Sequence, residues 1–393
     1  MMLPIRRTYI SPPTLAPGDA GAANNSALMG ATIKVAIDRT WPIEEILVVV
    51  TMKVGTTQFA TLTLDNILGI VQRFNLAVND GVSPRTAVDI SGIGLLEYGK
   101  LAGLNLDRST LNAVLASHGS TIAASNLYRV AYRIPLVHPL ITEPLRTRML
   151  MDANNFAQDP VLTMQFATAA QIGATGNMRN VSAEIILIRR QIPDALNAGI
   201  KAAGGFVPFD LIETPFTIAP GISGEQRFAL PVPGSYMNIC LRSYLGGSSV
   251  TRDVLDYSAG GVADCFAAES RWRIETGSVV LQEWRAKHLQ IINDWSCPSN
   301  SALDATSPNF GGLLVTNTNW EPAGSYMLDF LTDGLDTANE LGSVLDCNNV
   351  ATNGLKMEIV GSVASVATNA STLNMIGHRL FGDLSKWKTI SVA

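Results

Sequence analysis

The sequence predicts a mainly β protein built from two tandem antiparallel β-sandwich domains. Three observations indicate this class. Short runs that alternate between apolar and polar residues recur along the whole chain, Pro and Gly residues punctuate them, and a segment of the first half returns in the second half. A strict alternation of strands and helices, which is typical of a parallel sheet, is absent.

Composition excludes several classes of protein. Hydrophobic residues make up 47% and charged residues only 16% of the 393 residues, whereas soluble domains carry about 25% charged residues. Such a chain is too apolar to be disordered, and its 4 cysteines are too few for a disulfide scaffold. We also expect no membrane-spanning helix and no signal peptide, since the apolar runs are strand-sized. The low charge predicts surface that other subunits bury.

Charge is distributed unevenly between the halves. Residues 1–200 contain 16 Lys and Arg against 14 Asp and Glu, a net of +2, and residues 201–393 contain 12 against 19, a net of -7. The sum of -5 does not favour general nucleic-acid binding. The basic doublets Arg6-Arg7 and Arg189-Arg190 could meet anionic lipid or nucleic acid, but two charges are a weak signal.

Residues 1–30 are predicted to form an N-terminal arm without regular structure. Prolines interrupt it at positions 4, 12, 13 and 17, and residues 18–25 are small and polar. Arg6 and Arg7 are its basic residues. The first domain is therefore expected to begin at residue 31.

The first domain, residues 31–195, reads mostly as strands. Period-2 alternation and β-branched runs predict strands over 31–37, 43–54, 58–64, 127–136, 161–166 and 181–188. Apolar residues at helical spacing predict short helices over 67–74 and 93–101. The turn-rich segment 192–205 is the expected boundary.

The second domain, residues 205–393, has the same pattern. Strands are predicted over 206–211, 216–218, 226–230, 236–244, 313–316, 326–331, 355–360 and 375–380. Leu281, Trp284 and His288 lie at helical spacing and predict a helix over 279–292.

The repeat is the most informative feature. DANNFAQDPVLTMQF at 152–166 matches DCNNVATNGLKMEI at 346–359, a shift close to half the chain. Asp and Asn favour Asx-turns, so each D-x-N-N is a predicted corner before an alternating strand. The paired corner residues are Asp152, Asn154 and Asn155 in the first half and Asp346, Asn348 and Asn349 in the second. Chance similarity is the alternative, but several matches in the same order argue against it.

No catalytic, cofactor or metal site is predicted. GLLEYGK at 94–100 fits part of a phosphate-binding loop, but Leu101 replaces the Ser or Thr that binds magnesium, so a short helix is favoured. The 4 histidines lie far apart, and no G-x-S-x-G elbow occurs. A calcium site among Asp329, Asp333, Asp336 and Glu340 is an alternative to a solvated acidic loop.

Together these features resemble the double-jelly-roll major coat proteins of tailless icosahedral viruses with an internal membrane, the lineage of tectiviruses, corticoviruses and adenoviruses. The Pro-rich arm, the tandem β domains and the segment from 132–136 through 152–166, repeated as 324–331 through 346–359, carry the resemblance. It implies two upright eight-stranded jelly rolls, trimers with a pseudo-hexagonal outline, and an arm with Arg6 and Arg7 on the inner side of the shell.

The function that this resemblance implies is that of a major capsid protein, located in the virion and assembled in the host cytoplasm. Its partners would be copies of itself, penton or minor capsid proteins and, through the arm, the internal membrane, without specific nucleic acid. A two-domain module that binds carbohydrate or a receptor, as in a spike or lectin, is the alternative, and an enzyme with a dispersed site is a third hypothesis.

Overall fold

The structure is a computed structural model. It describes residues 5–10, 28–54, 68–79, 84–102, 127–139, 141, 145–172, 178–202, 205–218, 226–244, 271–285, 325–331, 344–351, 354–360 and 371–382. These residues belong to two compact units, the first ending at Phe206 and the second beginning at Val207. Each unit is described by itself below.

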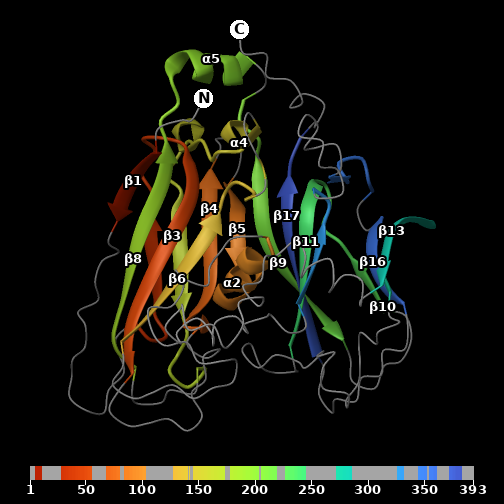
Figure 1. Cartoon of the computed structure of the whole chain (residues 1–393), viewed down its shortest axis with the longest axis horizontal. Coiled ribbons are helices and arrows are strands. Elements are labelled where there is room, and N and C mark those ends of the chain that lie inside the picture. The colour runs from red at the N-terminus through yellow and green to blue at the C-terminus, as the bar shows by residue number, and fades with distance from the viewer. Residues whose placement is uncertain are drawn as a thin grey trace, which may run out of the picture. The chain divides into compact units, whose positions relative to one another are not determined.

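Among its described residues, the first unit has eight strands in two sheets, and Figure 1 shows their arrangement. Its strands are β1 (Ile5–Ile10), β2 (Thr32–Ala36), β3 (Ile43–Val54), β4 (Val71–Asn79), β5 (Pro84–Ile90), β6 (Leu127–Pro135), β7 (Val161–Phe166) and β8 (Met178–Arg190). Antiparallel pairing gives the order β1-β8-β3-β6 in one sheet. The other sheet has the order β2-β7-β4-β5.

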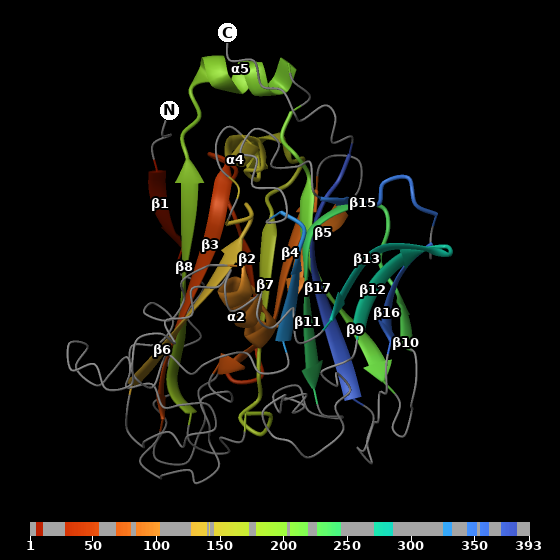
Figure 2. The ribbon, with the colours of Figure 1, turned by 45° about the vertical axis from the view of Figure 1, so that its right-hand side comes forward.

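The described helical segments of the first unit are α2 (Gly92–Leu101), α4 (Leu145–Arg148), the 3-10 helix Ala153–Asn155 and α5 (Asp194–Ala202). The strands bury alternate residues, as Ile46, Val48 and Val50 on β3 show. Figure 2 shows α4 and α5 at the same end of this unit. Among the described residues, no helix is long and apolar enough to cross a membrane.

The described residues of the second unit form nine strands. They are β9 (Phe209–Ile218), β10 (Gln226–Ala229), β11 (Ser235–Tyr244), β12 (Arg271–Thr276), β13 (Val279–Arg285), β14 (Ser325–Asp329), the two-residue β15 (Leu345–Asp346), β16 (Leu355–Val360) and β17 (Ser371–Leu380). One sheet has the order β9-β17-β11-β14, with β15 also on β11. The other has the order β10-β16-β12-β13.

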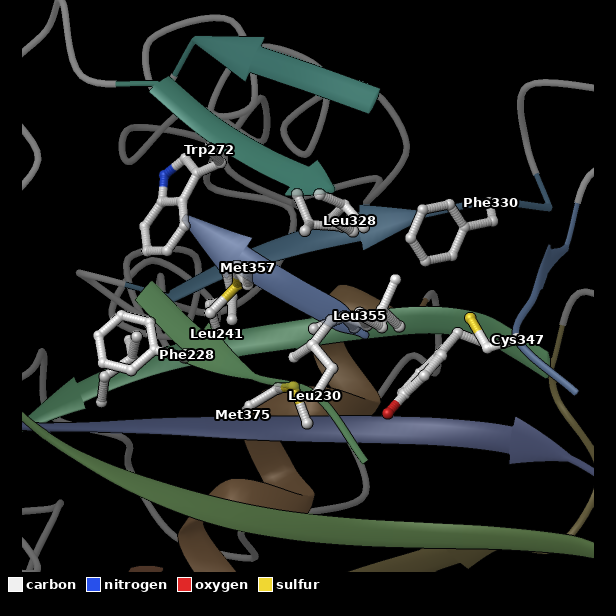
Figure 3. Close-up of a cluster of buried hydrophobic side chains, with 14 residues drawn as sticks. Phe228, Leu230, Leu241, Trp272, Leu328, Phe330, Cys347, Leu355, Met357 and Met375 are labelled. Carbon is white, nitrogen blue, oxygen red and sulfur yellow. The ribbon is translucent and has the colours of Figure 1, made fainter. Parts of the chain in front are cut away.

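The core of the second unit lies between its two sheets. Figure 3 shows Trp272 and Met357 from one sheet facing Leu241 and Met375 from the other. These side chains are almost completely buried. Two sheets that bury one face each against the other are the architecture of a β-sandwich.

The strand order is the same in both units. If β15 is set aside, each unit pairs its first, eighth, third and sixth strands in one sheet and its second, seventh, fourth and fifth strands in the other. Eight strands with this crossed order form a jelly roll. The predicted fold class, two tandem eight-stranded jelly rolls with short helices, is confirmed, and we refer to jelly rolls 1 and 2.

Three sequence predictions are wrong. The segment 279–292 is not a helix, because Val279–Arg285 is strand β13. Its apolar residues alternate, with Trp284 packed on the core and Leu281 exposed. The segment 67–74 runs into strand β4, which buries Phe74, Leu76 and Val78 at period 2. The segment 192–205, where the domain boundary is expected, contains helix α5.

The arm is the third correction. Residues 1–30 are not wholly irregular, since β1 pairs along β8 over six residues. The prolines lie on either side of β1, where they do not remove a donor from the ladder. The helix over 93–101 is confirmed by α2. The predicted strands 58–64 and 313–316 lie outside the described residues.

Candidate assembly surfaces

The two predicted corners have the same local geometry. The Asp152 carboxylate accepts a hydrogen bond from the Asn154 backbone N–H at 3.3 Å and caps the 3-10 helix. The Asp346 carboxylate accepts one from the Asn348 backbone N–H at 3.1 Å. Each corner precedes the seventh strand of its jelly roll, β7 or β16. In both, the side chain satisfies a backbone donor of the turn that it begins.

Side-chain contacts tie each corner to its surroundings. Asn155 Nδ2 donates to Asp152 Oδ2 at 2.5 Å. Asn348 Nδ2 donates to Asp346 Oδ1 at 2.8 Å and to Ser235 Oγ at 2.9 Å. Burial raises the pKa of Asp152 above its ordinary value, against the opposing effect of its hydrogen bonds. The Asp carboxylates and the Asn155 and Asn348 amides form hydrogen bonds within the corners, and Asn154, Asn155 and Asn349 are exposed.

Arg6 and Arg7 lie on β1, opposite Arg189 and Ile188 of β8. The second basic doublet is used within jelly roll 1. Arg189 is buried and donates to Thr40 Oγ1 at 2.9 Å and to the Asp38 carboxylate at 2.9 Å. Arg190 pairs with the buried Glu44 carboxylate. The Arg189-Arg190 doublet is therefore a structural element, not a free basic patch.

Glu44 forms ion pairs with two arginines. Its Oε1 accepts from Arg146 Nε at 2.9 Å, and its Oε2 accepts from Arg190 Nε. Burial disfavours the charged form of Glu44, but the hydrogen bonds from Arg190 and Arg146 outweigh it, so the pKa lies below its ordinary value. This cluster links the start of β3, the end of β8 and helix α4.

A row of alternating charges crosses one sheet of jelly roll 2. Arg227, Glu358, Arg273 and Glu283 lie directly opposite one another on the four strands β10, β16, β12 and β13. Their ion pairs measure 2.7 Å, 3.3 Å and 2.9 Å in that order. Glu358 is completely buried between its two arginines. The hydrogen bond from Arg273 holds the pKa of Glu283 below its ordinary value.

Jelly roll 1 carries part of this row. Arg73 on β4 pairs with Asp89 on β5 at 2.6 Å. These are the fourth and fifth strands, as are the strands of Arg273 and Glu283 in jelly roll 2. Cross-strand pairs of opposite charge stabilise a sheet face, so the two jelly rolls share a charge pair as well as a corner.

The outward face of the β1-β8-β3-β6 sheet has an apolar centre. Ile188 and Ile186 on β8 lie beside Leu47 and Val49 on β3, and all four are only partly buried. Charged residues surround them: Glu45, which receives two hydrogen bonds from Arg133, exposed Glu184 and exposed Arg129. We call this surface the open face. An apolar centre inside a charged rim is the arrangement of a protein interface.

Comparison with solved structures identifies the fold. The chain is similar to the crystal structure of the STIV MCP, with a TM-score of 0.63 and 15% identity over 98% of each chain. A second match is to the atomic structure of Sulfolobus Turreted Icosahedral Virus, with a TM-score of 0.61 and 15% identity over 95% of this chain and 90% of the other. The fold is the viral double jelly roll. The resemblance seen in the sequence is thus confirmed at the level of the fold.

A third match extends this double jelly roll to another virus. PBCV-1 VP54, fitted into a reconstruction of the virophage Sputnik, has a TM-score of 0.51 and 11% identity over 97% of this chain and 94% of the other. No protein-family model matches the chain. No curated protein matches it either.

The corresponding outward face in jelly roll 2 of this double jelly roll is polar. The corresponding sheet, β9-β17-β11-β14, points Asn238, Cys240 and Arg242 away from the core, and all three are buried. Arg242 donates to the equally buried Glu213 at 2.8 Å.

An exposed apolar segment lies on jelly roll 2. In the part of the chain that the structure describes, the exposed large hydrophobic side chains are Val279, Val280 and Leu281, with exposed fractions of 59%, 44% and 40%. They follow the Gly277 turn between β12 and β13, and we call them the hairpin tip. The sequence prediction missed this surface, because a helix over 279–292 would have turned Leu281 toward the core.

Several residues that the sequence offers for phosphate binding, calcium binding or catalysis have a structural environment in the described part of the chain. GLLEYGK lies in α2, where the Gly94 N–H donates to Ser91 Oγ as part of the helix start. Asp329 accepts from the Leu331 N–H, and the other residues of the acidic stretch lie outside the described ones. Burial lowers the pKa of His138 to about 3, so this histidine is neutral. Among the described residues, no group of three or more His, Cys, Asp or Glu could hold a metal ion.

Proposed function

We propose that this chain is a viral major capsid protein that assembles with copies of itself into an icosahedral shell. One observation carries the proposal: the double jelly roll aligns over 98% of both chains with the STIV MCP. The second matched structure is that of an icosahedral virus. A structural role without catalysis follows from the same likeness, and the neighbours give no support to a carbohydrate- or receptor-binding module.

The proposed assembly unit is a homotrimer. Each chain has two jelly rolls with the same strand order, so a trimer would contain six similar domains. Six similar domains around one axis would give a pseudo-hexagonal outline. Further partners would be neighbouring trimers and penton or minor capsid proteins. The segment with Arg6 and Arg7 would face the inner side and the membrane, and the two Asp corners would mark equivalent points of a duplicated domain.

Native mass spectrometry and gel filtration of the full chain test this function. We expect a species of three times the 41.9 kDa chain mass, and closed shells by electron microscopy after concentration. A strict monomer at high protein concentration and at every salt concentration would contradict the proposal.

A further inference from the structure

The first strands of the two jelly rolls, β1 and β9, have connections of very different length. Residues 11–31 join β1 to β2, which is 21 residues, whereas residues 219–225 join β9 to β10, which is 7 residues. Connections within a compact domain are usually about 4–6 residues long, and those longer than about 12–15 residues are mostly functional loops or linkers. The long connection of β1 therefore calls for a function.

The sequence of this connection is that of a linker. Residues 11–27, which we call the tether, contain 3 prolines, 2 glycines and 5 alanines, and Leu15 is their one large apolar residue. The tether ends where the chain is fixed on jelly roll 1, because Leu28 is buried and the Gly30 N–H donates to the Ala167 carbonyl at 2.9 Å. The 17 residues of the tether span at most about 55–60 Å, whereas the two sheets of a sandwich lie only about 10 Å apart. The tether is therefore long enough to carry β1 to a neighbouring chain.

One short ladder holds β1 on jelly roll 1. Its six residues pair with residues 185–190 of β8, and among the described strands β1 pairs with β8 alone. Its counterpart β9 pairs with β17 over ten residues. A second copy has the same β1 sequence and would make the same six-residue ladder. Exchange of β1 between two copies therefore loses no backbone hydrogen bond.

The edge of β8 needs this ladder. The covered segment contains the apolar run from Ile185 to Ile188, and Ile185 and Leu187 are buried. An apolar strand with an unpaired edge is a template for pairing with another chain. A chain whose β1 has moved away therefore presents a site that fits the β1 of another copy.

We propose that β1 is exchanged between copies, so that residues 5–10 of one chain complete the β1-β8-β3-β6 sheet of another. The inference rests on the proposed function, because it names a segment that links the copies in the assembly. A long linker lowers the effective concentration of β1 at its own β8 to about the millimolar range. Copies packed side by side present other β8 edges within reach of the tether, so assembly favours exchange more than dilution does.

Cysteine pairs placed across the ladder test the exchange. Arg7 and Ile188 lie directly opposite one another, and opposite Cα atoms of antiparallel strands are about 4.5–5.5 Å apart, which is within the range of a disulfide. Full chains with Arg7→Cys and full chains with Ile188→Cys are co-expressed, assembled and oxidised with copper phenanthroline. We expect a disulfide-linked dimer of twice the 41.9 kDa chain mass from the mixture, and none from either variant alone. Wild-type chains oxidised in parallel give the background of the native cysteines.

A second pair guards against failure of the first variants to fold. Tyr9 and Ile186 are also directly opposite on β1 and β8, and Tyr9→Cys with Ile186→Cys should give the same mixed dimer.

The matched control lies on the other sheet of jelly roll 1. Thr32 on β2 and Gln165 on β7 are directly opposite and exposed, and only the 6 residues 37–42 join β2 to β3. Thr32→Cys and Gln165→Cys in one chain should form a bond within that chain. The two single variants should form no dimer when they are mixed.

Three results would overturn the exchange. In the first, chains that carry both Arg7→Cys and Ile188→Cys form every bond within one chain. In the second, the control pair gives a mixed dimer, because contact between assembled chains would then explain the bonds. In the third, neither β1 pair forms any bond, because β1 would then not lie on β8. Native mass spectrometry before oxidation separates these results from the proposed function: an assembled wild type without exchange leaves that function intact, whereas a monomeric wild type contradicts both.

Discussion

Asp152 and Asp346 make the same hydrogen bond at the same point of two jelly rolls. Each carboxylate accepts from the backbone N–H two residues later, just before the seventh strand. Both strands then bury a Leu and a Met at period 2, Leu162 and Met164 in one and Leu355 and Met357 in the other. A short polar turn followed by this alternation positions the strand between its neighbours.

The first prediction concerns the corner of jelly roll 2. Asp346→Ala removes the acceptor for the Asn348 backbone N–H, for Asn348 Nδ2 and for Ser235 Oγ. The free energy of unfolding should fall by about 1–2 kcal/mol, the usual cost of a lost turn or cap acceptor. Urea denaturation of the variant measures this change. Asn349→Ala at the exposed neighbouring position should change it by less than about 0.5 kcal/mol, and an equal loss in both variants would contradict the assignment.

The sequence could predict the fold because the repeated segment has strong local signals. Strands β3, β7 and β16 agree with the predicted ranges, since β-branched runs and period-2 alternation agree with the tertiary structure there. The repeat also made a duplicated domain the natural hypothesis. The jelly-roll fold was implied only by the family resemblance, because pairing between strands that are distant in the sequence produces no local sequence pattern.

The assembly surfaces could not be predicted in the same way. Leu281, Trp284 and His288 fit helical spacing in the sequence, and only the pairing of Trp284 with Trp272 on β12 shows that the segment is a strand. The charge row depends on Arg273 and Glu358 meeting in register from strands far apart in the sequence. Partial exposure of Leu47 and Ile186 is likewise a property of the folded sheet, not of the pattern.

The second prediction tests the charge row. Glu358→Ala leaves Arg227 and Arg273 without the buried carboxylate between them. Loss of the buried carboxylate breaks two hydrogen-bonded ion pairs, and both arginines keep contact with solvent, so the cost should be about 1–3 kcal/mol and the melting temperature should fall. Glu184→Ala on the exposed margin of the open face is the matched control and should stay within about 0.5 kcal/mol of the wild type. Differential scanning calorimetry of both variants checks the contrast, and similar melting temperatures would refute it.

The third prediction concerns acid stability and Glu44. The folded state lowers its pKa below the ordinary value of 4.5 through Arg190 and Arg146. Glu44 therefore stabilises the native state fully above that value, and this contribution is lost as pH falls through the lower, folded pKa. Glu44→Gln should reduce stability at pH 7 and flatten its dependence on pH below about 4.5. Urea midpoints measured from pH 7 to pH 3 test this, and parallel curves for wild type and variant would exclude the role.

The fourth prediction concerns the close contact between Gly377 and Tyr236. A Cβ at position 377 would lie 2.7 Å from Tyr236 Cε1, and the ring cannot easily move because it is buried and its hydroxyl donates to the Pro231 carbonyl at 2.6 Å. Gly377→Ala should therefore destabilise jelly roll 2 by about 1–3 kcal/mol through overpacking.

Gly199 offers the matched control for this substitution. It lies in helix α5, and a Cβ there would meet no atom within 4 Å. Gly199→Ala should leave the protein unchanged or stabilise it by up to about 1 kcal/mol, because alanine favours a helix more than glycine does. Equilibrium unfolding in urea compares the two alanine variants directly. Opposite signs are expected, and a neutral Gly377→Ala would show that Tyr236 does not hold β17 at this distance.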